Sequence, residues 1–177
     1  MPTLTLERVN AMTLQAFLAA LGGVFEHSPW IAQRAFAARP FASVAALHVA
    51  MVDAVQRAPR EAQVALLNVH PELAGKEAQA GALTRSSTSE QAGVGLNALS
   101  REEMEAMARW NRQHREKFGF PFIIAVRQHS KASIFSEFQR RLTTDSETEL
   151  AACLEQVFAI ARLRLEDLVA AQPLGAA

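Results

Sequence analysis

Three side chains that can exchange a proton or orient a small molecule lie near helix ends that the sequence predicts. His70 opens the run His-Pro-Glu-Leu-Ala-Gly-Lys at 70–76, and a helix should end there because Pro71 disfavours helical backbone in the residue before it. Ser87 and Glu90 have the Ser-x-x-Glu spacing of a capping box, which typically opens a helix. An imidazole titrates near neutral pH and can act as a general acid or base. The sequence therefore predicts that His70, Ser87 and Glu90 converge on a small molecule.

Glu90 has a structural alternative as a helix cap, because the Ser-x-x-Glu pattern also occurs at Ser100–Glu103 and Ser146–Glu149. Against this alternative, Gly93 and Gly95 follow within the expected helix, where a glycine costs about 1 kcal/mol relative to alanine. Such glycines suggest that something packs or binds close to the backbone. The N-terminus of a helix also suits an anionic ligand.

The other histidines are weaker candidates. His70 itself has a structural alternative: a histidine at the C-terminal end of a helix can simply interact favourably with the helix dipole. His48 lies four residues after Val44 and three before Met51, which places it on an apolar face and favours a buried structural role.

Arg164 is the clearest anomaly in the periodicity of the chain. The expected C-terminal helix has an apolar stripe formed by Leu150, Leu154, Val157, Ala161, Leu165 and Leu168, and Arg164 lies on that stripe. Arg162 lies on the opposite side, four residues before Glu166, as in a solvated ion pair. An unpaired buried guanidinium is costly, so Arg164 is expected to form a buried salt bridge, to extend its charged end to solvent, or to bind an anionic ligand. Cys153 points near the same face and is interpreted as core packing.

The composition excludes several classes of protein. Half of the 177 residues are apolar, and 18 Lys and Arg balance 18 Asp and Glu, so no basic face for nucleic acid is indicated. One cysteine permits no internal disulfide, and no Cys/His spacing resembles a zinc site. The longest apolar run is far shorter than the ~20 residues of a membrane helix. Without an evident secretion signal, we expect a cytoplasmic protein that does not associate with membranes.

The arrangement of caps, prolines and glycines predicts an all-α fold, a single-domain bundle of about eight helices over residues 1–177 with an ordered core of about 4–170. Helices are expected to begin after Thr13, Ser28, Ser43, Ser87 and Ser100, and near Pro59, Lys131 and Ser146. Residues 118–126 are too apolar for a surface loop and are broken by Gly119 and Pro121. We expect a buried extended segment there, with a short strand as the alternative.

The chain resembles the 2-oxo-4-hydroxy-4-carboxy-5-ureidoimidazoline (OHCU) decarboxylase family from about Leu4 to Val169. The resemblance rests on six blocks in order, at 25–32, 39–41, 70–76, 87–96, 117–127 and 160–165. It implies cofactor-independent decarboxylation of OHCU to (S)-allantoin and CO2, the last step of urate oxidation in purine catabolism. It also implies an all-α homodimer.

The resemblance assigns roles to residues at matching positions. It implies that His70 and Glu90 are catalytic and that no metal takes part. Substrate-binding roles are implied for Pro71, Ser87, Gln91, Ile123, Ile124, Ala125, Val126 and Arg164. His114 departs from the family, in which tyrosine is often found at this position, and this leaves the local packing before Lys117 in question.

A second class of function fits the same residues. A non-catalytic helical module could bind a purine catabolite without converting it. Turnover of freshly generated OHCU would distinguish the enzyme from such a module.

Overall fold

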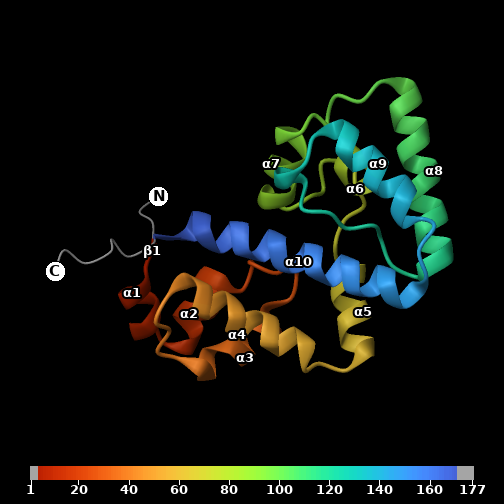
Figure 1. Ribbon diagram of the computed structural model, residues 1–177. Helices are drawn as coiled ribbons and strands as arrows, with labels where there is room; N and C mark the ends of the chain where they lie inside the picture. The colour runs from red at the N-terminus through yellow and green to blue at the C-terminus, as the bar shows by residue number, and fades with distance from the viewer. Residues whose placement is uncertain (1–3, 171–177) are drawn as a thin grey trace. The chain divides into compact units, whose positions relative to one another are not determined.

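The computed structural model describes residues 4–170 and divides the chain into two compact units (Figure 1). Of the described residues, one unit contains 4–66 together with 158–170, and the other contains 67–157. Within the described residues the chain is overwhelmingly helical, so the all-α prediction is confirmed. None of the described helices combines the length and the apolar character that crossing a membrane requires.

The first unit holds the N-terminal helices and the end of the chain's longest helix. Its elements are β1 (Leu4–Thr5), α1 (Leu6–Ala11), α2 (Leu14–Leu21), α3 (Pro29–Ala35), η1 (Phe36–Ala38), α4 (Val44–Gln56), most of α5 (Arg60–Asn68), the second part of α10 (Ser146–Leu168) and β2 (Val169–Ala170). The two short strands pair in parallel, with Leu4 opposite Val169. Neither these strands nor α1 was expected from the sequence.

Local capping explains where the helices of this unit begin. The hydroxyl groups of Thr13 and Ser43 accept hydrogen bonds from the backbone of α2 and α4, and Pro29 occupies the first position of α3. The predicted helix starts are therefore confirmed. The helices enclose apolar side chains, among them Phe17, whose ring meets that of Phe36 edge-on at 5.3 Å.

The second unit holds the middle of the chain. Its elements are α6 (Lys76–Gln79), α7 (Arg85–Gly93), α8 (Arg101–Phe118), η2 (Val126–Gln128), α9 (Lys131–Arg141) and the first part of α10. Trp110 of α8 packs edge-on against Phe135 of α9 at 5.4 Å. Gly119 ends α8 in the left-handed conformation (φ 82°), which glycine adopts without steric cost. The short helix α6 was not expected from the sequence.

The predicted buried segment near 118–126 is confirmed. Residues 121–125 have neither helix nor strand structure, and every residue from Phe120 to Val126 is buried. The side chains of Phe122, Ile124 and Val126 belong to the core of this unit, together with Leu73, Leu96, Met107, Ile134 and Phe138. An irregular backbone therefore runs through the core of the second unit.

Only one of the three predicted capping boxes has the expected form. The box of Ser100 and Glu103 at the start of α8 is confirmed. By contrast, Thr84 caps α7, which places Ser87 inside the helix. Asp145 accepts the backbone N–H groups of Glu147 and Thr148 at the start of α10, so Ser146 does not cap that helix. In both cases an acceptor one to three residues upstream takes the role that was assigned to the serine.

The prediction that two glycines lie inside a helix is also wrong. Helix α7 ends at Gly93, and Gly95 follows it in a turn with φ 78°. A β-carbon added at either glycine would meet no atom of the described chain within 4 Å, so neither glycine is required by close packing of another part of the protein. The turn explains Gly95, because few other residues tolerate this backbone conformation.

Candidate active site

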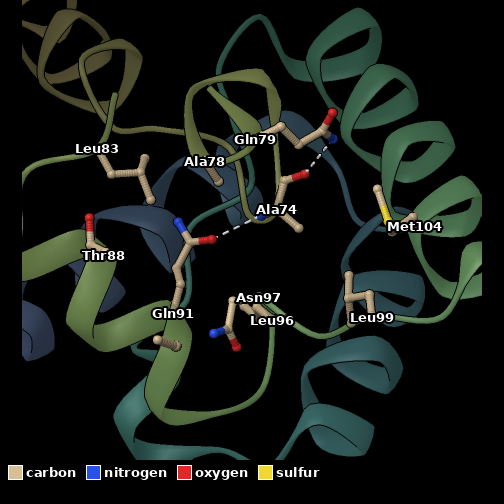
Figure 2. Close-up of a pocket in the computed structure, with 11 residues that line it drawn as sticks. Ala74, Ala78, Gln79, Leu83, Thr88, Gln91, Leu96, Asn97, Leu99 and Met104 are labelled. Atoms are coloured by element: carbon tan, nitrogen blue, oxygen red, sulfur yellow. Dashed lines mark hydrogen bonds between the residues drawn. The ribbon is translucent and has the colours of Figure 1, made fainter. Parts of the chain in front are cut away.

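The loop that follows His70 is held by side chains from α7 and α6. His70 lies just beyond α5 and is 7% exposed. Figure 2 shows Gln91 of α7 and Gln79 of α6 on either side of Ala74. The Ala74 N–H donates to Gln91 Oε1 at 2.9 Å, and Gln79 Nε2 donates to the Ala74 carbonyl at 3.1 Å. Ala74 itself has φ 48°, a left-handed conformation that is uncommon for residues other than glycine, asparagine and aspartate.

Helix α8 holds the same loop from another direction. The buried side chain of Asn111 donates to the Leu73 carbonyl at 2.9 Å. Arg115 donates to Glu72 at 2.8 Å and to Asn68 at 3.0 Å. Side chains from three helices thus fix the backbone immediately after His70 and Pro71.

Three of the predicted site residues lie on α7. Ser87 and Gln91 are one turn apart and buried, and Glu90 is half-buried beside them. Helix α7 contacts η2, the short helix that begins at Val126. The second unit therefore contains His70, Pro71, the α7 residues and the backbone of Ile123–Val126, with Gln91 bonded directly to the loop that follows His70.

The backbone of residues 121–126 is only partly available to a ligand. The Ile123 carbonyl accepts from Arg141 Nη1 at 2.8 Å, and the Ala125 N–H donates to Gln156 Oε1 at 3.0 Å. The carbonyls of Ala125 and Val126 accept from the N–H groups of Gln128 and His129 in the following turn. Ile123 and Ala125 therefore use these groups internally, and among the described residues Ile124 makes no hydrogen bond.

A cavity of about 360 Å³ adjoins this region in the second unit (Figure 2). Its lining includes Gln91, Thr88, Leu96, Asn97 and Met104. Of the predicted site residues described in the structure, Gln91 lines it, whereas His70, Ser87 and Glu90 do not. The cavity is mostly apolar with a few amide and hydroxyl groups, which is typical of a small-molecule pocket.

A buried polar network that the sequence analysis missed lies behind the 121–126 backbone. Arg141 Nη2 contacts Glu149 Oε1 at 2.6 Å, and Arg141 Nε lies 3.1 Å from both carboxylate oxygens. His114 Nε2 lies 2.8 Å from the same Glu149 oxygen, and His114 Nδ1 lies 3.0 Å from the Phe120 carbonyl. The three side chains are at most 3% exposed.

Charge and burial oppose one another in this network. Burial by itself would raise the pKa of Glu149, but the hydrogen bonds from His114 and Arg141 and the positive charge of Arg141 lower it below its ordinary value of 4.5. Burial raises the pKa of the Cys153 thiol to about 12. Glu149 is therefore an anion at neutral pH and Cys153 a neutral thiol, in agreement with the predicted packing role of Cys153.

The same network brings three types of metal ligand together. His114, Glu149 and Cys153 lie with their ligand atoms within 4.8 Å of one another, although nothing in the sequence spacing indicated a metal site. Arg141 donates to both Glu149 oxygens and lies 3.0 Å from Cys153 Sγ, so it already supplies the positive charge. A metal ion would have to displace this guanidinium and deprotonate a thiol of raised pKa. These residues fit a buried ion pair better than a metal centre.

A signal for this network is present in the sequence. His114 follows the buried residues Met107 and Asn111 at helical spacing, and Arg141 follows Ile134 and Phe138 in the same way. Arg164 was identified from the same kind of helical spacing. The spacing in α8 and α9 places His114 and Arg141 as polar groups on inward faces.

Arg164 lies in the first unit and points inward as predicted. It is 6% exposed, and its Nη1 donates to Glu26 at 2.8 Å and to the Val24 carbonyl at 3.3 Å. Arg162 is exposed and pairs with Glu166 at 2.9 Å. The opposite orientations of the two arginines are confirmed. Glu26 provides the buried carboxylate that a structural salt bridge of Arg164 requires. His48, by contrast, is only half-buried, and its Nε2 lies 2.8 Å from the Phe158 carbonyl.

Comparisons with known proteins agree with this all-α architecture. The sequence profile of OHCU decarboxylase matches residues 10–166. A 2-oxo-4-hydroxy-4-carboxy-5-ureidoimidazoline decarboxylase of Haloferax volcanii is 42% identical over 94% of this chain and 97% of its own length. A uric acid degradation bifunctional protein of Bacillus subtilis is 38% identical over 93% of this chain, which corresponds to 33% of that longer protein.

A solved structure supports the same relationship. The crystal structure of an (S)-allantoin synthase superposes with a TM-score of 0.74 at 26% identity. The alignment covers 94% of this chain and 54% of the solved chain, so this protein spans about half of that length. The protein belongs to the OHCU decarboxylase family.

Proposed function

We propose that this protein is a carboxy-lyase that converts OHCU to (S)-allantoin and CO2, the last step of urate oxidation. The family match across residues 10–166 carries the proposal. The names of the relatives, an OHCU decarboxylase and a uric acid degradation protein, point to the same reaction. The packing of His70, Ser87, Glu90 and Gln91 into one compact unit supports it further.

The substrate carries its own electron sink. The carbon that bears the carboxylate also bears a hydroxyl and adjoins a ring C=N bond. When the bond to the carboxylate breaks, its electron pair moves into the C=N group and CO2 leaves. A proton must then be delivered to one face of the ring to give the (S) product. The protein has only to orient the carboxylate, stabilise the charge and supply the proton.

We assign the proton-transfer roles to His70 and Glu90. His70 handles the hydroxyl proton and helps to orient the leaving carboxylate. Glu90 holds the ring or ureido N–H groups and helps to place the new proton. Ser87 and Gln91 orient the polar atoms of the substrate beside Pro71. Gln91 does this through its Nε2, because its Oε1 already accepts from Ala74.

Two further groups complete the proposed substrate contacts. The backbone of Ile123–Val126 recognises the ureide edge, which explains why apolar side chains form part of a polar site. The Ile123 carbonyl and the Ala125 N–H already form hydrogen bonds within the protein. The ureide is therefore recognised mainly by Ile124 and by the Val126 N–H. Arg164 is assigned a contact with the substrate through the family resemblance, although its pairing with Glu26 equally suits a structural role.

Two further properties are proposed, the first of them from the family resemblance. The protein is a homodimer, and it acts in the cytoplasm. Light scattering over a range of concentrations tests the first property. Cell fractionation of a natural source, followed with an antibody, tests the second.

The decisive experiment supplies OHCU generated freshly from urate by the upstream enzymes. We expect this protein to accelerate (S)-allantoin formation, followed by circular dichroism, beyond a control without it. The rate should be unchanged after exhaustive chelation, because the proposed reaction uses no cofactor or metal. Saturable binding of (S)-allantoin without acceleration would instead favour the non-catalytic module that binds a purine catabolite.

A further inference from the structure

The backbone of residues 121–126 has two edges that differ in their hydrogen bonding. Along one edge, the Pro121 carbonyl lies 3.8 Å from Cys153 Sγ, the Ile123 carbonyl accepts from Arg141, and the Ala125 N–H donates to Gln156. These partners come from α9 and α10. In an extended chain, alternate residues direct their N–H and C=O groups to opposite edges, and the pattern at odd-numbered positions follows this rule.

The other edge is open. Within residues 4–170, the N–H and C=O groups of Phe122 and Ile124 and the N–H of Val126 have no hydrogen-bond partner. Ile124 is only 3% exposed. Buried backbone polar groups are almost always paired, so an unpaired set on one edge points to a ligand that pairs with it.

The chemistry of the open edge matches a ureide. Ile124 presents one donor and one acceptor on the same side, as a strand does to its neighbour. A urea-type group presents an N–H and a C=O in the same plane and can form both bonds at once. This match rests on the proposed function, since it takes OHCU as the ligand.

Two side chains hold the residues on either side of Ile124. Arg141 Nη1 is bonded to the Ile123 carbonyl at 2.8 Å, while its Nε and Nη2 are bonded to Glu149. Gln156 Oε1 accepts the Ala125 N–H at 3.0 Å. With the peptides on both sides fixed to α9 and α10, the Ile124 groups cannot rotate to use those partners themselves.

We propose that Arg141 and Gln156 are positioning residues for the decarboxylation: they anchor Ile123 and Ala125 so that the N–H and C=O of Ile124 stay directed at the ureide of the substrate. Neither side chain needs to touch the substrate. Their effect is to orient a recognition element, and errors of about 1 Å in such elements can cost about 100-fold in rate.

The first variant tests the arginine anchor. Arg141→Lys keeps a positive charge beside Glu149, but an ammonium cannot reproduce the guanidinium contacts with both Glu149 and the Ile123 carbonyl. We expect kcat/KM for OHCU to fall by about 10- to 100-fold, with KM raised. Arg140→Lys is the matched control, because the neighbouring Arg140 is exposed and pairs only with Glu137 among the contacts found in the described chain.

The second variant does not disturb the buried ion pair. Gln156 is uncharged and half-buried, so Gln156→Ala should fold even if Arg141→Lys does not. It should also lower kcat/KM, by about tenfold. Gln156→Glu retains an oxygen acceptor of the same reach for the Ala125 N–H and should recover most of the activity. Gln139→Ala, at an exposed position of α9, is the control.

The outcomes separate positioning from simple stabilisation. Impaired kcat/KM in folded Arg141→Lys and Gln156→Ala proteins, with recovery in Gln156→Glu, supports the proposal. If the variants lower the melting temperature but keep wild-type KM and kcat, the two residues only stabilise the fold and the proposal is wrong. If Arg141→Lys does not fold, Gln156→Ala and Gln156→Glu decide alone. A wild-type protein inactive on OHCU would reject the proposed function as well, whereas an active wild type with active variants rejects only this inference.

Discussion

At the scale of single residues, His70 and Glu90 are the groups proposed to carry the proton chemistry. We predict that His70→Ala and Glu90→Ala each lower kcat by about 10²- to 10⁴-fold while the helical circular dichroism spectrum is retained, because each removes a positioned proton-transfer group. Steady-state kinetics with freshly generated OHCU measure the loss.

The structure supplies a matched control for Glu90. Glu103 completes a true capping box at the start of α8, whereas Glu90 lies in α7, a helix capped by Thr84. Glu103→Ala therefore removes a cap and the ion pair of Glu103 with Lys131, neither of which involves the proposed site residues, and should keep wild-type turnover. Equal kinetics in the Glu90→Ala and Glu103→Ala proteins would remove Glu90 from the catalytic residues. Glu149, which has the same sequence pattern, is unsuitable as a control because it is buried in an ion pair.

Variants of Arg164 and Arg162 test whether Arg164 contacts the substrate or only forms a structural ion pair. Arg164→Lys keeps a charge for Glu26 but loses the planar guanidinium, so we predict impaired kcat/KM with the anionic substrate. Arg162→Ala should change the free energy of unfolding by no more than about 0.5 kcal/mol and leave the kinetics unchanged, because its side chain is 69% exposed. A folded Arg164→Lys enzyme with normal kinetics would leave Arg164 with a structural role only.

Glu149 links stability to pH. Its pKa in the folded protein lies below the ordinary 4.5, so its contribution to stability is fully present above about pH 4.5 and is lost as the pH falls below that value. We predict that Glu149→Gln lowers the free energy of unfolding at pH 7 by about 3–5 kcal/mol, since it leaves the buried Arg141 charge without its anion. The variant should then lose less further stability on acidification than the wild type does. Denaturant unfolding at pH 7 and pH 4 measures both effects, with the exposed Glu147→Gln as the control. Parallel losses on acidification in wild type and variant would contradict the assignment.

At the scale of elements, the sequence predicts helices better than it predicts their first residues. Thr13 and Ser43 were identified as caps because each precedes an apolar helical pattern, and Ser100 because of its spacing from Glu103. Each forms the expected bond. At α7 and α10 several possible acceptors are adjacent in sequence. The choice of Thr84 over Ser87 and of Asp145 over Ser146 depends on how each helix packs, which local spacing does not contain.

The same limit applies to the candidate site. The histidine, the carboxylate and the inward arginine could be proposed as site residues from the sequence because helix ends and apolar stripes are local patterns. The partners of the 121–126 backbone could not be found in this way. Arg141 and Gln156 are 18 and 31 residues from the groups that they bind, and only the folded chain brings them together.

The start of helix α7 tests whether Thr84, and not Ser87, caps that helix. The Thr84 hydroxyl accepts the Ser87 N–H at 3.3 Å. We predict that Thr84→Ala destabilises the start of α7 by about 1 kcal/mol and speeds hydrogen exchange there, because that N–H group loses its partner. Ser87→Ala removes no cap, so it should leave the exchange of the first turn near the wild-type rate. Slower exchange in Thr84→Ala than in Ser87→Ala would show that Ser87 caps the helix after all.

At the scale of the whole molecule, the way the chain unfolds tests the single-domain expectation. The chain forms two compact units, and the boundaries between them fall inside helices: after Leu66 within α5 and after Val157 within α10. A domain boundary normally lies in an exposed flexible linker. Figure 1 shows α10 as one continuous helix across its boundary.

A helix shared by two units couples their unfolding. If the second unit unfolded alone, α10 would have to break near Val157, lose backbone hydrogen bonds and expose apolar side chains of its inner face. We therefore predict one cooperative thermal transition, with equal calorimetric and van't Hoff enthalpies.

Replacing Ala159, near the boundary inside α10, with proline should uncouple the units, because proline removes a helical N–H and clashes with the preceding turn. The wild type should thus show one transition and Ala159→Pro two. Two transitions in the wild type would mean that the units fold independently and that the chain contains two domains.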